Sequence, residues 1–127
     1  MPITLPWAIL VVDDDPLIRM ATGDMLESIG LDVLFASSAD EALGVLQNQP
    51  IAAIVTDVVM PGTLDGLGLV SMIRRRWPAI RIVVTSGHVP AEAAGNAANT
   101  AFLQKPFQAG QLLEALDLPR VASAQPA

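Results

Sequence analysis

The sequence predicts an α/β domain, a doubly wound five-stranded parallel sheet with helices on both faces. Short apolar runs of strand length alternate along the chain with stretches of helical periodicity, which is typical of βαβ units. The first run is apolar throughout, as a strand covered on both faces would be. The 127 residues are enough for one domain with a buried core and too few for two.

Five apolar segments are predicted to be the strands of this sheet. Polar residues that favour turns follow them, as Thr85-Ser86-Gly87 does after the fourth. Strands that alternate with helices pair in parallel through right-handed crossovers. The predicted strands are residues 7–12, 32–36, 51–56, 80–84 and 101–104.

Capping residues, glycine and proline mark the helix boundaries. Asp15-Pro16 supplies an N-cap and a proline at the first helical position, and the apolar face of this helix extends to Ile29, just before Gly30. Ser38 and Glu41 form a capping box in which Glu41 reaches back to the cap. The predicted helices are residues 16–29, 39–49, 67–76, 90–98 and a last one that carries Leu112, Leu113 and Leu116. Residues 1–118 then make one domain, and residues 119–127 a flexible tail.

Composition excludes several classes of protein. No cysteine is present and histidine occurs once, which excludes a disulfide scaffold, a zinc–thiolate site and a multi-histidine metal site. Thirteen acidic residues against seven basic ones argue against a nucleic-acid-binding module and against a polybasic membrane anchor. The amino terminus lacks the charged start and long apolar stretch of a signal peptide. We therefore expect a soluble, cytoplasmic protein.

Chemically active side chains follow the predicted strands. Asp13 and Asp14 follow the first strand, Asp57 the third, Thr85 the fourth and Lys105 the fifth. Open α/β sheets bind ligands at the carboxyl ends of their strands, so the three carboxylates are expected to meet in one pocket. Such a cluster repels itself unless a cation neutralises it, and oxygen ligands favour Mg²⁺. With a hydroxyl and an ammonium beside it, the pocket suits a phosphoryl group, which an Asp57 oxygen attacks in line.

At these strand ends the chain resembles the response-regulator receiver domains of two-component signalling. The resemblance extends from about Ala8 to Leu116, and it implies the flavodoxin-like strand order 2-1-3-4-5. Each motif alone is weak, but four of them in this order at predicted strand ends are highly specific. The motifs are Val11-Val12-Asp13-Asp14-Asp15, Asp57-Val58-Val59-Met60-Pro61 with Asp65-Gly66, Thr85-Ser86-Gly87 and Lys105-Pro106-Phe107.

The resemblance implies a phosphoacceptor and a magnesium site. Asp57 is the implied phosphoacceptor. Asp14 is the implied direct ligand of Mg²⁺, and Asp13 contributes mainly through water. Asp57 and the backbone carbonyl of Val59 complete the protein ligands.

The resemblance also implies a switch. Lys105 pairs with Asp57 and then with the phosphoryl group, and the bond from Lys105 to Pro106 is expected to be cis. Thr85 is the hydroxyl that moves onto the phosphoryl group. Phe102 occupies the position of the switch aromatic, although a lone aromatic in a strand is as well explained as a core residue.

Two other features have simpler interpretations. His88 is a second candidate phosphoacceptor or proton shuttle, but an exposed loop histidine is favoured. The run Arg74-Arg75-Arg76 is most simply a solvated helix end.

The function predicted from the sequence is that of a stand-alone or nearly stand-alone receiver. It accepts a phosphoryl group from a sensor histidine kinase or a histidine phosphotransfer protein. It then signals by binding a downstream protein, or it acts as a phosphate shuttle or sink. It catalyses its own phosphorylation and dephosphorylation and is otherwise not an enzyme. The alternatives are a receiver excised from a hybrid kinase, a small phosphatase of the haloacid-dehalogenase type with Asp13-Asp14-Asp15 at its centre, and a receiver-like module that binds partners without phosphate.

Overall fold

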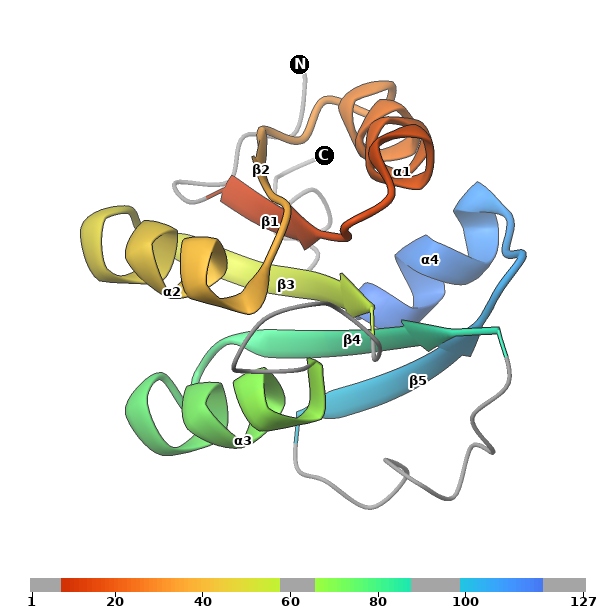
Figure 1. Ribbon diagram of the computed structural model, residues 1–127. Helices are drawn as coiled ribbons and strands as arrows, with labels where there is room; N and C mark the ends of the chain where they lie inside the picture. Colours follow the sequence, from red (N-terminus) through yellow and green to blue (C-terminus); the bar gives the residue numbers. More distant parts are fainter. Residues whose placement is uncertain (1–7, 58–65, 88–98, 118–127) are drawn as a thin grey trace, which may run out of the picture.

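Five parallel strands form the centre of the protein (Figure 1). The computed structural model describes residues 8–57, 66–87 and 99–117. Every neighbouring pair of strands is parallel, and the order is β2-β1-β3-β4-β5, as predicted. The strands are β1 (Ala8–Val12), β2 (Val33–Ala36), β3 (Ile51–Asp57), β4 (Arg81–Ser86) and β5 (Thr100–Gln104).

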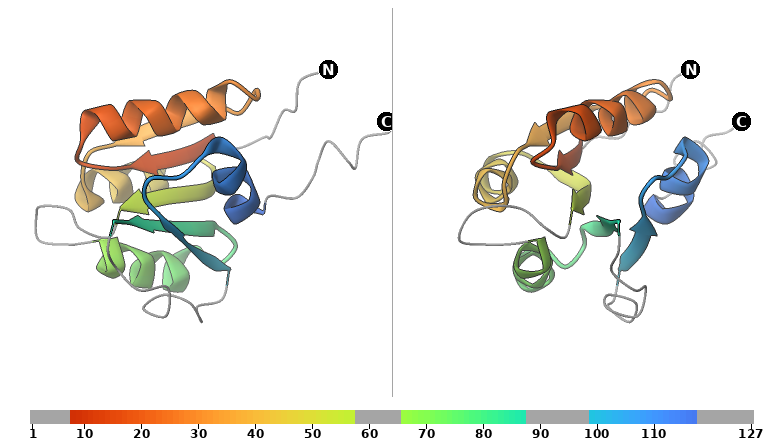
Figure 2. Two further views of the ribbon diagram at one scale, coloured as in Figure 1. Left: turned by 90° about the vertical axis from the view of Figure 1, so that its right-hand side faces the viewer. Right: turned by 45° about the vertical axis from the view of Figure 1, so that its right-hand side comes forward.

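Helices cover both faces of the sheet. Helices α1 and α4 lie on one face, and α2 and α3 lie on the other (Figures 1 and 2). The helix predicted over residues 90–98 lies outside the described residues. The helices are α1 (Pro16–Glu27), α2 (Ala39–Asn48), α3 (Gly66–Arg76) and α4 (Ala109–Leu116).

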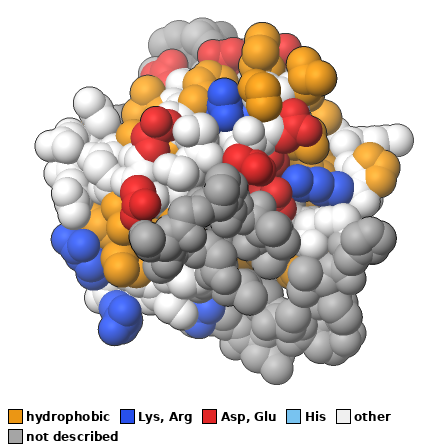
Figure 3. All heavy atoms as spheres, viewed as in Figure 1, with side chains coloured by type: hydrophobic (Ala, Val, Ile, Leu, Met, Phe, Trp, Pro, Cys, Tyr) orange, Lys and Arg blue, Asp and Glu red, His pale blue; other side chains and the backbone are white. Residues whose placement is uncertain are grey.

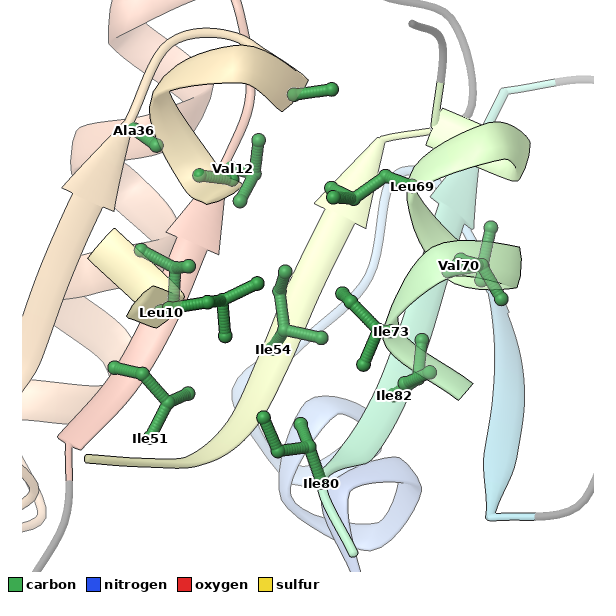
Figure 4. Packing of buried hydrophobic residues seen from close by; sticks show 14 residues of the cluster. Leu10, Val12, Ala36, Ile51, Ile54, Leu69, Val70, Ile73, Ile80 and Ile82 are labelled. Atoms are coloured by element: carbon green, nitrogen blue, oxygen red, sulfur yellow. The ribbon is translucent and has the colours of Figure 1, made fainter. Parts of the chain in front are cut away.

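Strand β1 contributes side chains to two hydrophobic cores, one on each face of the sheet, and this explains its apolar run. Its residues alternate between the faces, because successive side chains of a strand point to opposite sides. Leu10 packs with residues of α2 and α3, among them Ile73, on one face (Figure 4). Ile9 packs with Leu26 of α1 and Leu112 of α4 on the other. Both faces of β1 are therefore buried, as the sequence indicated.

The first helix begins as predicted and ends earlier. The Asp15 side chain accepts from the backbone N–H of Leu17 at 2.9 Å and caps α1. The helix ends at Glu27, and Gly30 then adopts a positive φ of 92°, which glycine tolerates best. The prediction that Ile29 belongs to the apolar face was wrong. Because the chain leaves the helix before it, Ile29 is 38% exposed.

The capping box of α2 differs by one residue from the prediction. The hydroxyl of Ser38 accepts from the backbone N–H of Glu41 at 3.1 Å, as expected. The carboxylate of Glu41, however, accepts from the N–H of Ser37 at 2.8 Å. The long glutamate side chain reaches one residue beyond the cap and satisfies a donor there.

Candidate functional site

Three carboxylates meet at the carboxyl end of the sheet. Asp13 and Asp14 directly follow β1, and Asp57 is the last residue of β3, which lies next to β1. One carboxylate oxygen from each of the three lies within 4.8 Å of the others. Asp13 is buried and Asp14 is exposed. Acidic side chains gather on this face beside a basic one in the space-filling view (Figure 3). The strand order thus brings together acids that are far apart in the sequence.

A single ammonium group bridges two of these carboxylates. Lys105 Nζ lies 3.1 Å from Asp13 Oδ2 and 3.3 Å from Asp57 Oδ2. Lys105 follows β5, and its backbone N–H donates to the carbonyl of Ser86 at 2.8 Å. The peptide bond from Lys105 to Pro106 is cis. The contact between Lys105 and Asp13 was not foreseen from the sequence, which suggested only the pair with Asp57.

The electrostatics of the site keep Lys105 charged. Burial by itself would lower the pKa of Lys105, but the hydrogen bond and charge of Asp13, together with Asp57, outweigh burial and raise it. When all are ionised, three carboxylates against one ammonium leave two excess negative charges. An all-oxygen donor set with excess negative charge fits a hard dication such as Mg²⁺.

Thr85 lies beside the acids, but its hydroxyl donates a hydrogen bond to the main chain. It is paired with Asp57 across β3 and β4, and it is buried. Its hydroxyl donates to the backbone carbonyl of Thr56 at 3.4 Å, which is a long hydrogen bond. The hydroxyl is therefore bonded to the main chain of the residue before Asp57.

Asp13 is held by several hydrogen bonds at the junction between β1 and α1. Its backbone N–H donates to the carbonyl of Ala36 at 3.2 Å, and its Oδ1 accepts from the N–H of Asp15 at 3.0 Å. Its backbone carbonyl accepts from Nη1 of Arg19 at 2.8 Å. Sequence reasoning missed Arg19. Arg19 follows the cap residue Asp15 by four positions and so lies on the same side of the helix, but this spacing does not by itself predict the contact with the carbonyl of Asp13.

The remaining predicted site residues lie apart from this cluster or outside the described residues. Phe102 is half-buried and packs against the core beneath α2 and α3. Val59 and His88 lie outside the described residues. The three arginines at the end of α3 are exposed, and the guanidinium of Arg76 stacks 4.6 Å from the ring centre of Trp77.

Comparison with known proteins identifies the family. The family model of the response regulator receiver domain matches residues 9–117. The chain belongs to this family. This assignment agrees with the resemblance seen in the sequence and does not favour a phosphatase of the haloacid-dehalogenase type.

Relatives and solved structures agree with the assignment. An NtrX-like response regulator from Rickettsia conorii is 32% identical over 83% of the chain, and NtrX from Azorhizobium caulinodans is 36% identical over 83%. The receiver domain of NtrX from Brucella abortus has a TM-score of 0.76 and 33% identity, over 86% of this chain and 98% of that one. A response regulator receiver protein from Pseudomonas putida has a TM-score of 0.77 and 34% identity, over 91% of this chain and 98% of that one.

The match covers only part of the curated relatives. The chain spans 23% of the Rickettsia protein and 24% of the Azorhizobium protein.

Among the described residues, no helix has both the length and the apolar character that crossing a bilayer requires.

Proposed function

We propose that this receiver accepts a phosphoryl group on Asp57 from a phosphohistidine and signals by binding a downstream protein. The donor is a sensor histidine kinase or a histidine phosphotransfer protein in the cytoplasm. The observation that carries the proposal is the contact of one ammonium, Lys105 Nζ, with both Asp57 and Asp13 at the strand ends. This arrangement presents a carboxylate nucleophile beside a fixed positive charge.

The transfer exchanges one bond to phosphorus for another. An oxygen of Asp57 attacks the phosphorus in line, and the O–P bond forms as the P–N bond to the donor imidazole breaks. The imidazole nitrogen keeps the bonding electron pair and takes up a proton from solvent water. Lys105 Nζ, 3.3 Å from Asp57 Oδ2, pairs with a phosphoryl oxygen as negative charge moves onto the aspartyl group. Its raised pKa supports this role, because the ammonium stays protonated at neutral pH.

Asp13, Asp14 and Asp57 form the magnesium site of this proposal, with the backbone carbonyl of Val59 as a further predicted ligand. Bound Mg²⁺ neutralises charge on the phosphoryl oxygens. Asp13 already accepts a backbone N–H on Oδ1 and the ammonium of Lys105 on Oδ2. Asp14 is exposed. This difference supports Asp14 as the direct ligand and Asp13 as a ligand through water.

Thr85 and Phe102 form the proposed switch. The hydroxyl of Thr85 exchanges its long bond to the carbonyl of Thr56 for a phosphoryl oxygen on Asp57. Phe102 changes rotamer with it and reports the phosphorylated state to a partner. Phe102 packs beside Val84, the residue before Thr85, across the pair of β4 and β5.

Intact mass after incubation with acetyl phosphate and Mg²⁺ tests the phosphoacceptor. We expect the gain of one phosphoryl group, which is lost in Asp57→Asn and in the presence of a chelator. Asp24→Asn is the matched control, since Asp24 is exposed on α1 and does not belong to the acidic cluster. Labelling that persists in Asp57→Asn would refute Asp57 as the acceptor. The absence of labelling in the folded wild-type chain, with both acetyl phosphate and a phosphorylated kinase, would refute the phosphoacceptor function.

A further inference from the structure

The side chain of Arg19 turns back from α1 onto the end of β1. Its Nη1 donates to the backbone carbonyl of Asp13 at 2.8 Å, six residues earlier in the chain. Arg19 is partly buried at this contact. The bond spans the junction at which the chain leaves the sheet and enters the helix, and it adds to the cap that Asp15 already supplies there.

The peptide group that Arg19 holds lies between two candidate magnesium ligands. The carbonyl of Asp13 belongs to the peptide unit that joins Asp13 to Asp14. Because a peptide unit is planar, a hydrogen bond that restrains its oxygen also restrains the positions of both adjoining Cα atoms. The two carboxylate side chains begin at those atoms, so this hydrogen bond limits where they can lie.

We propose that Arg19 is a positioning residue that prepares Asp13 and Asp14 for Mg²⁺ by holding the peptide unit between them. The inference rests on the proposed function, because it concerns the magnesium site. Arg19 itself does not contact the metal or the phosphoryl group in this role. It acts through the main chain, as residues that orient metal ligands commonly do.

Three roles for Arg19 predict different effects on Mg²⁺ affinity. A positive charge near a dication opposes its binding, so a role through charge alone predicts tighter binding when Arg19 is removed. A role in folding alone predicts a less stable protein with unchanged affinity. A positioning role predicts weaker binding, because the carboxylates then spend less time in the binding arrangement.

Arg81 offers a matched control at the opposite end of the sheet. It begins β4, and its Nε and Nη2 donate to the backbone carbonyl of Ala115 at 3.1 and 3.0 Å. Like Arg19, it therefore holds a main-chain carbonyl through its guanidinium group. Arg81→Met removes both of these hydrogen bonds and the same charge while leaving the acidic cluster intact.

The test measures the dissociation constant of Mg²⁺ by calorimetry for the full chain and its variants, with the unfolding midpoint of each in chelator. Arg19→Met is expected to weaken Mg²⁺ binding about tenfold. Arg19→Lys, which keeps the charge but not the planar guanidinium, is expected to bind more weakly than wild type as well. Arg81→Met is expected to lower the unfolding midpoint and leave Mg²⁺ affinity unchanged.

Two results would overturn the inference, and they are distinguishable. Normal Mg²⁺ binding by wild type, with equal or tighter binding by Arg19→Met, would refute the positioning role alone. The absence of Mg²⁺ binding in wild type would refute both the magnesium role and the positioning role.

Discussion

Replacing Lys105 by methionine separates its charge from its bulk. The variant keeps a long apolar stem but leaves three clustered carboxylates without the ammonium that bridges two of them. The remaining charges repel one another more strongly, so we expect the variant to be less stable than wild type in a chelator. We also expect Mg²⁺ to restore most of this loss, because a dication replaces the missing positive charge.

The exposure of the three side chains sets the size of the effect. The exposed fractions are 19% for Lys105, 6% for Asp13 and 14% for Asp57. Exposed ion pairs contribute about 0–1 kcal/mol, and breaking a fully buried pair costs about 3–5 kcal/mol. The expected loss in chelator lies between these ranges, at about 2 kcal/mol. If Mg²⁺ then binds the variant about tenfold more tightly, saturating Mg²⁺ raises the free energy of unfolding of the variant by about 1.4 kcal/mol more than that of wild type.

Urea unfolding with chelator and with saturating Mg²⁺ measures both quantities. The free energy of unfolding of Lys105→Arg in chelator is expected to stay close to that of wild type, because the variant keeps the positive charge. Arg76→Met removes an exposed charge at the end of α3 and controls for the change in net charge. The reasoning fails if Lys105→Met loses no stability in chelator, or if Mg²⁺ stabilises wild type and variant equally.

Three further predictions concern other parts of the molecule. A methyl group at Gly23 would lie 2.5 Å from Cε1 and Cζ of Phe35, so Gly23→Ala should lower the free energy of unfolding in urea by about 1 kcal/mol. A methyl group at Gly44 would have no atom within 4 Å, so Gly44→Ala should raise the free energy of unfolding by about 0.5–1 kcal/mol. Leu17 and Met20 lie three residues apart on α1 and are 78% and 60% exposed, which makes this helix a candidate surface for a protein donor. Leu17→Ser should therefore slow phosphotransfer from a protein donor and leave labelling by acetyl phosphate unchanged. The pKa of Lys105 is raised on folding, so its stabilising contribution is complete below the unfolded value of about 10.4 and is lost as the pH rises through the folded value. Stability above about pH 10 should therefore fall more steeply in wild type than in Lys105→Met.

Most of the fold follows from local patterns in the sequence. Continuous apolar runs mark strands that are buried on both faces, and β1 is such a strand because it lies between β2 and β3. The gathering of Asp13, Asp57 and Lys105 follows from the same reasoning. Residues that follow parallel strands lie at one edge of the sheet, whatever their separation along the chain.

The features that were not predicted are the end of α1 and the contacts made by long side chains. Helical periodicity shows which face is apolar but not the residue at which the helix ends, so Ile29 was wrongly included in the apolar face of α1. The reach of Glu41 to Ser37 and of Arg19 to the carbonyl of Asp13 depends on side-chain rotamers and on the path of the backbone. Neither is determined by residue type and spacing alone. The same holds for the contact of Lys105 with Asp13, which depends on two strands on opposite sides of β3.

Lys105 and Arg19 hold different atoms of Asp13, and their removal should change Mg²⁺ affinity in opposite directions. Lys105 donates to a carboxylate oxygen, so its charge competes directly with a cation for the acids. Arg19 donates to the main-chain carbonyl, so it acts on the direction of the acids more than on their charge. Removing Lys105 should tighten Mg²⁺ binding and abolish efficient phosphorylation, whereas removing Arg19 should weaken Mg²⁺ binding. Since both substitutions remove one positive charge, net charge cannot produce opposite shifts, and only the difference in what each side chain holds explains them.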